Sequence, residues 1–466
     1  MEPLLYTQEQ PTNGSHALNT REPLQAALHA VHGLTLLRDV LQDRAASAFL
    51  DLLRVLATPD PDPSTLATSY SHVFRALAEI ANDEALPRLA DAWQAYLATR
   101  LIDDRNPWSQ QVECVGSARV SSTLREQARR DLRALQQLFQ LDAHILLAQV
   151  EALVTPALPA LHDAWLPWCD LAPLPVEIHS DARDLLAARM AACDNWAELV
   201  DALEQHWTRH GTGSQSCYHV LRWLGADKQL AGIAHPDVVY LANLVGQERQ
   251  QKRLTTNIER FLAGLPAQDM LLYGPPGTGK SSTVKALVNT YADAGLCLVE
   301  VSKEDIGDLP QVVAQLRERA PRYLLFIDDL SFEEHETSYK ALKVLLEGTA
   351  EARPANVLIC ATSNRLNLIR ESFSERGKPS DDVNWRDTMD EKQSLVHRFA
   401  LRVTFMSPDQ RQYLSIVEGL ARQRGLDLSI ETLQERALQW ERQHTGRSGR
   451  VARQFVDDLE AELKYH

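Results

Sequence analysis

Cysteine is scarce in this sequence, with 6 residues in 466, and none of them is spaced as a CxxC pair. A disulfide scaffold needs far denser cysteine and is excluded, whereas scattered cysteines are typical of reduced thiols in a cytosol. Long hydrophobic runs are also lacking, because no stretch reaches the roughly 18 uninterrupted apolar residues that span a bilayer. The first residues carry neither the basic nor the apolar stretch of a secretory signal. We therefore expect a cytoplasmic protein that does not contact membranes.

Positive charge is in short supply as well. Lys and Arg total 48 against 63 Asp and Glu, which gives a formal net charge of −15. Affinity for duplex nucleic acid rests on clustered cationic charge, so a nucleic-acid partner is not favoured. The composition is otherwise ordinary, with 44% hydrophobic and 24% charged residues, and this excludes collagen-like and disordered chains.

Lysine is nearly absent from the first half of the chain. Only Lys228 of the 10 lysines precedes residue 236, and seven of the nine tryptophans lie in the same stretch. Residues 1–235 hold 18 basic and 29 acidic residues, whereas residues 236–466 hold 30 and 34. This shift in composition predicts a domain boundary near residue 235. At about 150 residues per domain, the length suggests three domains.

The two halves also differ in apolar periodicity. Apolar residues recur at three- and four-residue spacing through residues 1–235, which predicts an all-helical N-terminal domain. Later, short apolar runs alternate with amphipathic helical segments, at residues 269–273, 296–301, 323–327, 356–362 and 401–405. This alternation predicts an α/β domain over residues 236–405, with a parallel sheet and helices on both faces. Three helical segments follow in residues 406–466.

A glycine-rich loop is the strongest motif. The pattern G-x-x-x-x-G-K-[ST] is matched at every position by Gly274, Pro275, Pro276, Gly277, Thr278, Gly279, Lys280 and Ser281. An expected strand at 270–273 precedes the loop, and an expected helix at 280–291 follows it. The glycines let backbone N–H groups turn toward an oxyanion, and the helix start adds a positive dipole end. Lys280 suits the outer phosphates and the Ser281 hydroxyl suits Mg²⁺, so we predict a nucleotide site that also includes Ser282.

Two carboxylates follow the apolar run at 323–327 and predict the second half of the site. A strand that ends in Asp328 places a carboxylate beside the Mg²⁺ held by Ser281. Asp329 is then suited to orient and deprotonate the attacking water, and Glu333 ranks second for this role. A turn-capping role for Asp329 remains an alternative.

Residues 240–466 resemble the AAA+ ATPases, a family of P-loop NTPases. Before the glycine-rich loop, the segment 245–248 is similar to the family's N-terminal box, which contacts adenine, and this resemblance assigns Gly246 to nucleotide binding. The stretch from residue 264 through the loop, with residues 328–333 and 361–365, is still more similar to one bacterial branch. That branch of predicted ATPases is known only as a domain of unknown function. The resemblance implies ATP and Mg²⁺ as cofactors and a helical lid over residues 406–466.

Three further roles are implied by the resemblance. Asn364 resembles sensor 1, a polar side chain that helps to place the attacking water. Arg398 resembles the arginine finger offered to the γ-phosphate of a neighbouring subunit, with Arg402 as its rival. Arg450 resembles sensor 2, which reaches from the lid to the nucleotide, with Arg453 as the alternative.

The function that the resemblance implies is Mg²⁺-dependent hydrolysis of ATP to ADP and phosphate, coupled to remodelling or switching of a macromolecular partner. Because the finger must come from a neighbour, it also implies a ring or helical homo-oligomer. Residues 1–235 are then expected to recognise an unknown protein partner. Asp-Asp, where Asp-Glu is commonest, leaves open a nucleotide-gated binding module with little turnover. A DNA-linked loader or initiator is a further alternative, which the acidic first half disfavours.

Overall fold

A computed structural model gives the structure of the protein. It describes residues 21–83, 86–171, 181–213, 215–331, 339–347, 353–364, 395–444 and 446–465. The chain divides into two compact units. Unit 1 comprises Met1–Thr208 with Thr212–Ser214, and unit 2 comprises Arg209–Gly211 with Gln215–His466. Among the described residues, no helix combines the length and the apolar character that crossing a membrane requires.

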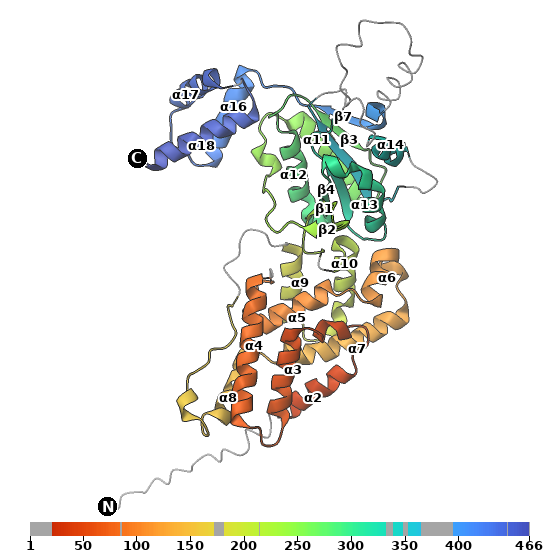
Figure 1. Ribbon diagram of the computed structural model, residues 1–466, viewed down its shortest axis with the longest axis vertical. Coiled ribbons are helices and arrows are strands. Elements are labelled where there is room, and N and C mark those ends of the chain that lie inside the picture. The colour runs from red at the N-terminus through yellow and green to blue at the C-terminus, as the bar shows by residue number, and fades with distance from the viewer. Residues whose placement is uncertain are drawn as a thin grey trace, which may run out of the picture. The chain divides into compact units, whose positions relative to one another are not determined.

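The regular elements of unit 1 are helices in the part of the chain that is described, apart from an isolated β-bridge between Asp91 and Cys169 (Figure 1). Its α-helices are α2 (Arg21–His32), α3 (Arg44–Ala57), α4 (Pro63–Asp83), α5 (Ala92–Asp103), α6 (Pro107–Val115), α7 (Ser122–Phe139), α8 (Ala143–Val154), α9 (Asp181–Ala192) and α10 (Val200–His210). Short 3₁₀ turns connect them: η1 (Arg38–Leu41), η2 (Ser117–Arg119), η3 (Pro159–Leu161) and η4 (Trp196–Leu199). One continuous apolar core joins these elements, and its largest side chains are aromatic, with Phe49 stacked on Trp93 at 3.6 Å between ring centroids.

Polar side chains fix where these helices begin. Asp43 begins α3, Asn106 begins α6 and Asp142 begins α8, each by accepting a backbone N–H of the first turn. Asp91 does the same for α5 and also accepts the N–H of Ala143, at 2.6 Å, at the start of α8. Each such cap contributes about 1 kcal/mol to helix stability.

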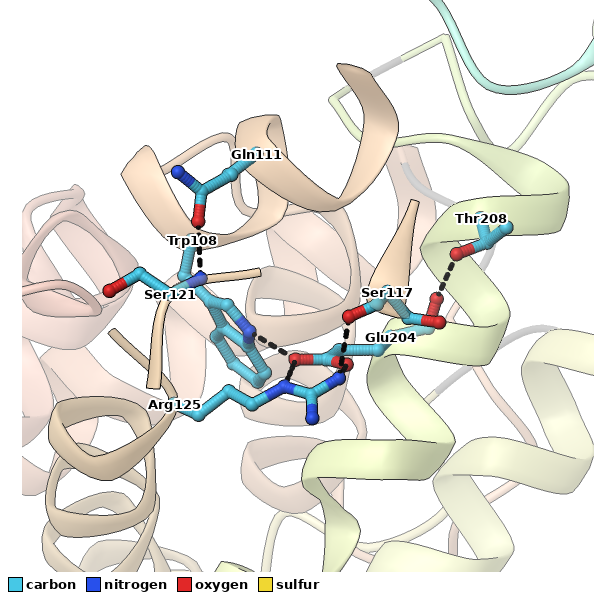
Figure 2. A network of polar contacts seen from close by, with 7 residues as sticks. All are labelled: Trp108, Gln111, Ser117, Ser121, Arg125, Glu204 and Thr208. Carbon is cyan, nitrogen blue, oxygen red and sulfur yellow. Dashed lines mark hydrogen bonds and ion pairs between the residues drawn. The ribbon is translucent and has the colours of Figure 1, made fainter. Parts of the chain in front are cut away.

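A buried polar network ties α6, η2, α7 and α10 together (Figure 2). Glu204 on α10 is fully buried, and its carboxylate accepts the Trp108 indole N–H at 2.9 Å. Arg125 on α7 donates its Nε–H to the same carboxylate at 2.9 Å and also donates to it through Nη2. The Arg125 Nη2 further donates to the Ser117 carbonyl at 2.7 Å. The Arg125 guanidinium therefore forms an ion pair with the buried Glu204 carboxylate.

Unit 2 contains one mixed sheet, which has seven strands within the described residues, in the order β2-β1-β4-β5-β6-β3-β7 (Figure 1). The strands are β1 (Val220–Leu224), β2 (Gln229–Gly232), β3 (Met270–Tyr273), β4 (Leu296–Glu300), β5 (Arg322–Ile327), β6 (Val357–Ser363) and β7 (Leu401–Thr404). β1 and β2 are antiparallel, and all other neighbours are parallel. The predicted α/β class is thus confirmed, and each of the five expected strands is present.

Helices cover both faces of this sheet. Helices α11 (Glu248–Leu262) and α12 (Lys280–Tyr291) pack on the face that carries Met270 and Leu272 of β3. Helices α13 (Leu309–Leu316) and α14 (Tyr339–Glu347) pack on the opposite face, to which Leu271 points. Successive residues of a strand alternate between faces, so an apolar strand can serve both layers. The 3₁₀ turns of this part are η5 (Leu241–Asn243), η6 (Ala292–Ala294) and η7 (Lys303–Asp308).

Three helices follow β7: α16 (Gln410–Gln423), α17 (Ile430–Gln443) and α18 (Gly449–Tyr465). They share an apolar core of their own, which includes Tyr413, Leu433 and Phe455. Asp409 begins α16 by accepting the Gln412 N–H, and this side-chain cap marks the change from strand to helical segment. We call residues 406–466 the lid below.

The predicted boundary at residue 235 lies after the β1–β2 hairpin, whereas the two compact units part at residues 208–215. β1 pairs with β4 in the sheet of unit 2, so residues 220–232 are strand and not helix. The change in composition near residue 235 does not mark the boundary between the two units. Trp223, one of the seven tryptophans before that residue, is buried in the sheet of unit 2. The division of the chain into three domains remains a prediction.

Candidate nucleotide-binding site

The glycine-rich loop connects β3 to α12, as its motif predicts. Gly277 has a φ of 76° and Gly279 a φ of 91°, and this left-handed backbone strongly favours glycine. Gly274 approaches β7 so closely that a Cβ would lie 1.9 Å from the Phe405 carbonyl oxygen. Helix α12 then begins at Lys280, which turns its first free N–H groups toward the loop. A loop of this shape at a helix start is suited to bind phosphate oxygens.

Lys280 extends its side chain under the loop. Its Nζ donates to the carbonyls of Gly274 at 2.7 Å and Pro275 at 2.9 Å, and to Asn364 Oδ1 at 3.0 Å. Burial lowers the pKa of Lys280, while the nearby Asp329 and Asp328 carboxylates act in the opposite direction. The ammonium group therefore stands between the loop and the acidic end of the sheet.

Ser281 and Asp328 meet as the sequence predicts. The Ser281 hydroxyl donates to Asp328 Oδ1 at 2.6 Å, and the Thr362 hydroxyl on β6 donates to the same oxygen at 2.5 Å. A serine hydroxyl and an exposed carboxylate this close are hard oxygen donors, which Mg²⁺ prefers. The residues present therefore fit the Mg²⁺ that the motif implies.

Asp329 adopts a φ of 49°, an uncommon value for a residue other than glycine. Its N–H donates to Thr362 Oγ1 at 2.9 Å. Its carboxylate accepts the Asn364 amide N–H at 2.6 Å, and Asn364 in turn accepts from Lys280. The predicted water-activating carboxylate, sensor residue and loop lysine thus form one hydrogen-bonded chain.

A cavity of about 470 Å³ contains these groups. Its apolar part is formed by Leu244 and Val245 before α11 and by Ile416 and Leu420 of the lid. The rest of its lining includes residues predicted from the sequence, namely Pro276, Gly277, Gly279, Lys280, Ser281, Ser282, Asp328, Asp329, Asn364 and Arg450. It also includes Asn243, Gln247, Thr362, Gly449 and Arg453. Apolar side chains together with a phosphate loop and acidic residues in one cavity suit a nucleoside polyphosphate.

The lid reaches the loop directly. The backbone N–H of Arg450 donates to the Gly277 carbonyl at 3.2 Å, and the Arg450 and Arg453 side chains both line the cavity. The structure therefore leaves both candidates for the lid sensor in place. Gly246 does not itself line the cavity among the described residues, and its carbonyl accepts from Gln412 of the lid at 2.8 Å.

Arg398 lies away from this cluster. Arg398 is exposed, on a helical turn at 395–398, and does not line the cavity in the part of the chain that is described. A finger offered to a neighbour would be exposed, and this role remains a prediction. Glu333 lies outside the described residues.

Two side chains at the site were not assigned roles from the sequence. Thr362 bridges Asp328 and Asp329, and it could have been found because it stands two residues before Asn364 on the same strand face. Gln247 contacts the loop through Thr278, and the signal for it in the sequence is its place in the segment 245–248 that resembles the N-terminal box.

The fold and the site together define a P-loop protein of the AAA+ class. The chain belongs to DUF815, described as a protein of unknown function, whose family model matches residues 216–463. It is 26% identical over 201 residues to the 26S proteasome regulatory subunit 6B homolog of Schizosaccharomyces pombe, covering 37% of this chain and 51% of that protein. It is also 26% identical over 176 residues to the proteasome-activating nucleotidase of Saccharolobus solfataricus, covering 32% of this chain and 44% of that protein.

The chain therefore spans about half the length of these curated relatives. Among solved structures, the RuvB Holliday junction branch migration motor of Thermotoga maritima matches with a TM-score of 0.36 and 16% identity, over 49% of this chain and 66% of that one.

Proposed function

We propose that the protein binds ATP with Mg²⁺ and hydrolyses it to ADP and phosphate. The observation that carries this proposal is the single cavity in which the Ser281–Asp328 pair lies beside the chain of Lys280, Asn364 and Asp329. These are the groups that phosphoryl transfer to water requires: a phosphate cradle, ligands for a divalent cation and a carboxylate near the reacting end.

Each residue has a distinct task in this proposal. The loop N–H groups and Lys280 hold the phosphates, and the apolar side chains of Val245 and Ile416 receive the base. Ser281 and Asp328 would hold Mg²⁺, which supplies positive charge against the phosphate oxygens. Asp329 accepts the proton of the attacking water, and Asn364 keeps that carboxylate in place. Most of the catalysis is positioning and electrostatic stabilisation.

Self-association and partner recognition complete the proposal. Arg398 is exposed and would serve a neighbouring subunit's site, so hydrolysis should rise with protein concentration as rings or helical assemblies form. Such a finger is worth about 10³–10⁵ in rate. Turnover would then drive remodelling or switching of a macromolecular partner held by the helical N-terminal part. If Arg398→Ala leaves the rate unchanged at high concentration, this part of the proposal is wrong.

The binding test uses two lysines on the same helix. Lys280→Ala should abolish ATP binding measured by titration calorimetry. Lys285→Ala is the matched control, because Lys285 lies on α12 but pairs with Asp237 at 3.1 Å, outside the cavity. If Lys280→Ala still binds ATP, or if both variants lose ATP binding to the same extent, the assignment of the nucleotide site is wrong.

A second candidate is a nucleotide-gated binding module with little turnover. It is favoured by Asp329, a shorter carboxylate than the glutamate that is commonest at this position in the AAA+ pattern. Single-turnover assays separate the two functions: the ATPase proposal expects phosphate release that Asp329→Asn abolishes without loss of ATP binding. If wild type and Asp329→Asn release phosphate equally slowly, the binding module is the better description.

A further inference from the structure

Gln247 stands at the junction between the base-side segment and the phosphate loop. It immediately precedes α11, yet its side chain makes no cap bond with that helix. Its amide is turned to the loop instead: Nε2 donates to the Thr278 carbonyl at 2.9 Å, and Oε1 accepts the Thr283 hydroxyl at 3.0 Å. One side chain thus contacts both the loop and the first turn of α12.

The contact at Thr278 fixes the direction of a loop peptide. In a trans peptide the carbonyl and the next N–H point in opposite directions. The bond from Gln247 holds the Thr278 carbonyl on its own side, so the Gly279 N–H is held on the opposite side. Gly279 lines the cavity, and an inward N–H at this position would serve a phosphate oxygen.

Packing reinforces this hydrogen bond. Gly279 has a φ of 91°, and a Cβ on it would lie 2.5 Å from Gln247 Nε2. The amide is therefore packed against Gly279, whose left-handed backbone strongly favours glycine. The neighbouring Gly246 carbonyl accepts from Gln412 of the lid at 2.8 Å, so the same segment also touches α16.

We propose that Gln247 is a positioning residue that orients the phosphate loop, although it stands in the segment that resembles an adenine-contacting box. This inference rests on the proposed nucleotide site. It assigns Gln247 to the polyphosphate part of binding and not to base recognition, because one of its donors is engaged by the loop and its acceptor by the first turn of α12.

The test compares ligands with and without phosphates. Binding of adenosine, ADP, ATP and tripolyphosphate is measured by competition against a fluorescent ADP analogue. Gln247→Ala removes both side-chain hydrogen bonds and should weaken ATP, ADP and tripolyphosphate by at least about tenfold, the effect expected from losing the bond to Thr278 alone. Adenosine affinity should not change. Gln247→Glu keeps an acceptor for Thr283 but places a carboxylate opposite the Thr278 carbonyl. It should therefore bind the three phosphate ligands no more tightly than Gln247→Ala does.

A second variant guards against a folding defect. Thr283→Val removes the hydroxyl that donates to Gln247 Oε1 at 3.0 Å and to the Gly279 carbonyl at 2.8 Å, and it should weaken ATP binding several-fold without adding fully to Gln247→Ala. Gln250→Ala is the matched control, because Gln250 lies three residues after Gln247, in the first turn of α11, but donates to the Thr404 carbonyl, at 3.2 Å. It should leave all four affinities unchanged.

The outcomes distinguish a failure of the proposed nucleotide site from a failure of the role assigned to Gln247. If wild type fails to bind ATP, the nucleotide site itself is wrong and the role of Gln247 falls with it. If wild type binds ATP but Gln247→Ala weakens adenosine as much as ATP, Gln247 contacts the base and the inference alone is overturned. Unchanged ATP affinity in both Gln247→Ala and Thr283→Val also overturns the inference alone.

Discussion

Replacing Arg125 by Met should lower the free energy of unfolding of unit 1 by about 3 kcal/mol. Glu204 is fully buried and accepts three N–H groups, of which Arg125 supplies two and Trp108 one (Figure 2). Methionine keeps most of the apolar contact of the arginine stem. It removes both charge-assisted bonds and leaves a buried carboxylate with a single donor.

The magnitude follows from this geometry. Removing one partner of a buried ion pair costs about 3–5 kcal/mol. The Arg125 side chain is 29% exposed, so water can reach the vacated space and the lower end of that range applies. Glu204→Gln removes the charge but keeps an acceptor for Trp108, and we expect it to cost about 2 kcal/mol. The double variant should be no worse than Arg125→Met, which gives a coupling energy of at least about 2 kcal/mol.

The assay is urea denaturation followed by tryptophan fluorescence. Six of the nine tryptophans precede residue 209, so the signal reports mainly on unit 1. Arg54→Met is the control: Arg54 forms an ion pair with Asp51 in which the side chains are 58% and 63% exposed, and its loss should not be measurable. The reasoning is refuted if Arg125→Met stays within about 1 kcal/mol of wild type, or if the two single effects simply add.

Three further predictions concern single residues. Burial raises the pKa of Asp104 to about 6, so the folded state loses stability as this carboxyl ionises between about pH 4 and pH 6. Asp104→Asn should therefore stabilise unit 1 by up to about 3 kcal/mol at pH 7 and by little near pH 4, and equal shifts in melting temperature at both pH values would contradict this. Thr362→Val removes the hydroxyl that orients Asp328 and should lower the ATPase rate about tenfold, whereas Thr362→Ser should retain it; equal rates would count against the bridge. Gly419→Ala should destabilise unit 2 by about 1–3 kcal/mol in thermal unfolding, because the alanine Cβ would lie 2.6 Å from Val245 Cγ2. Alanine is the better helix former, so an unchanged or raised melting temperature would show that this close contact does not control stability.

The sequence predicts the phosphate loop and its flanking elements closely. The expected helix at 280–291 coincides with α12, and the expected strand at 323–327 is β5 with one more residue at its start. These elements are encoded locally: glycines supply backbone angles that other residues resist, and uninterrupted apolar runs mark strands buried on both faces. Local chemistry of this kind needs no knowledge of distant neighbours.

The rest depends on pairing between distant segments. The hairpin of β1 and β2 is short, and it is recognisable only by its pairing with β4, about 75 residues later in the chain. The Gln247 contact with Thr278 and the lid contact of Gly277 with Arg450 likewise join segments that periodicity cannot relate. Composition placed the boundary at residue 235 because charge is a property of surfaces and does not report which strands pair.

The second carboxylate after β5 shows how sequence and backbone compensate one another. Aspartate at position 329 is one methylene shorter than the glutamate that the AAA+ pattern commonly carries there, so its reach is smaller. The chain turns into the left-handed region at this residue, with a φ of 49°, and the turned carboxylate meets Asn364 at 2.6 Å. Aspartate tolerates this conformation better than most side chains, because it bonds to local backbone and polar groups. The Thr362 hydroxyl accepts the Asp329 N–H and so holds the turn in place. A shorter side chain and a turned backbone together place the carboxylate beside Asn364, so the departure from the common pattern is compatible with the proposed hydrolysis.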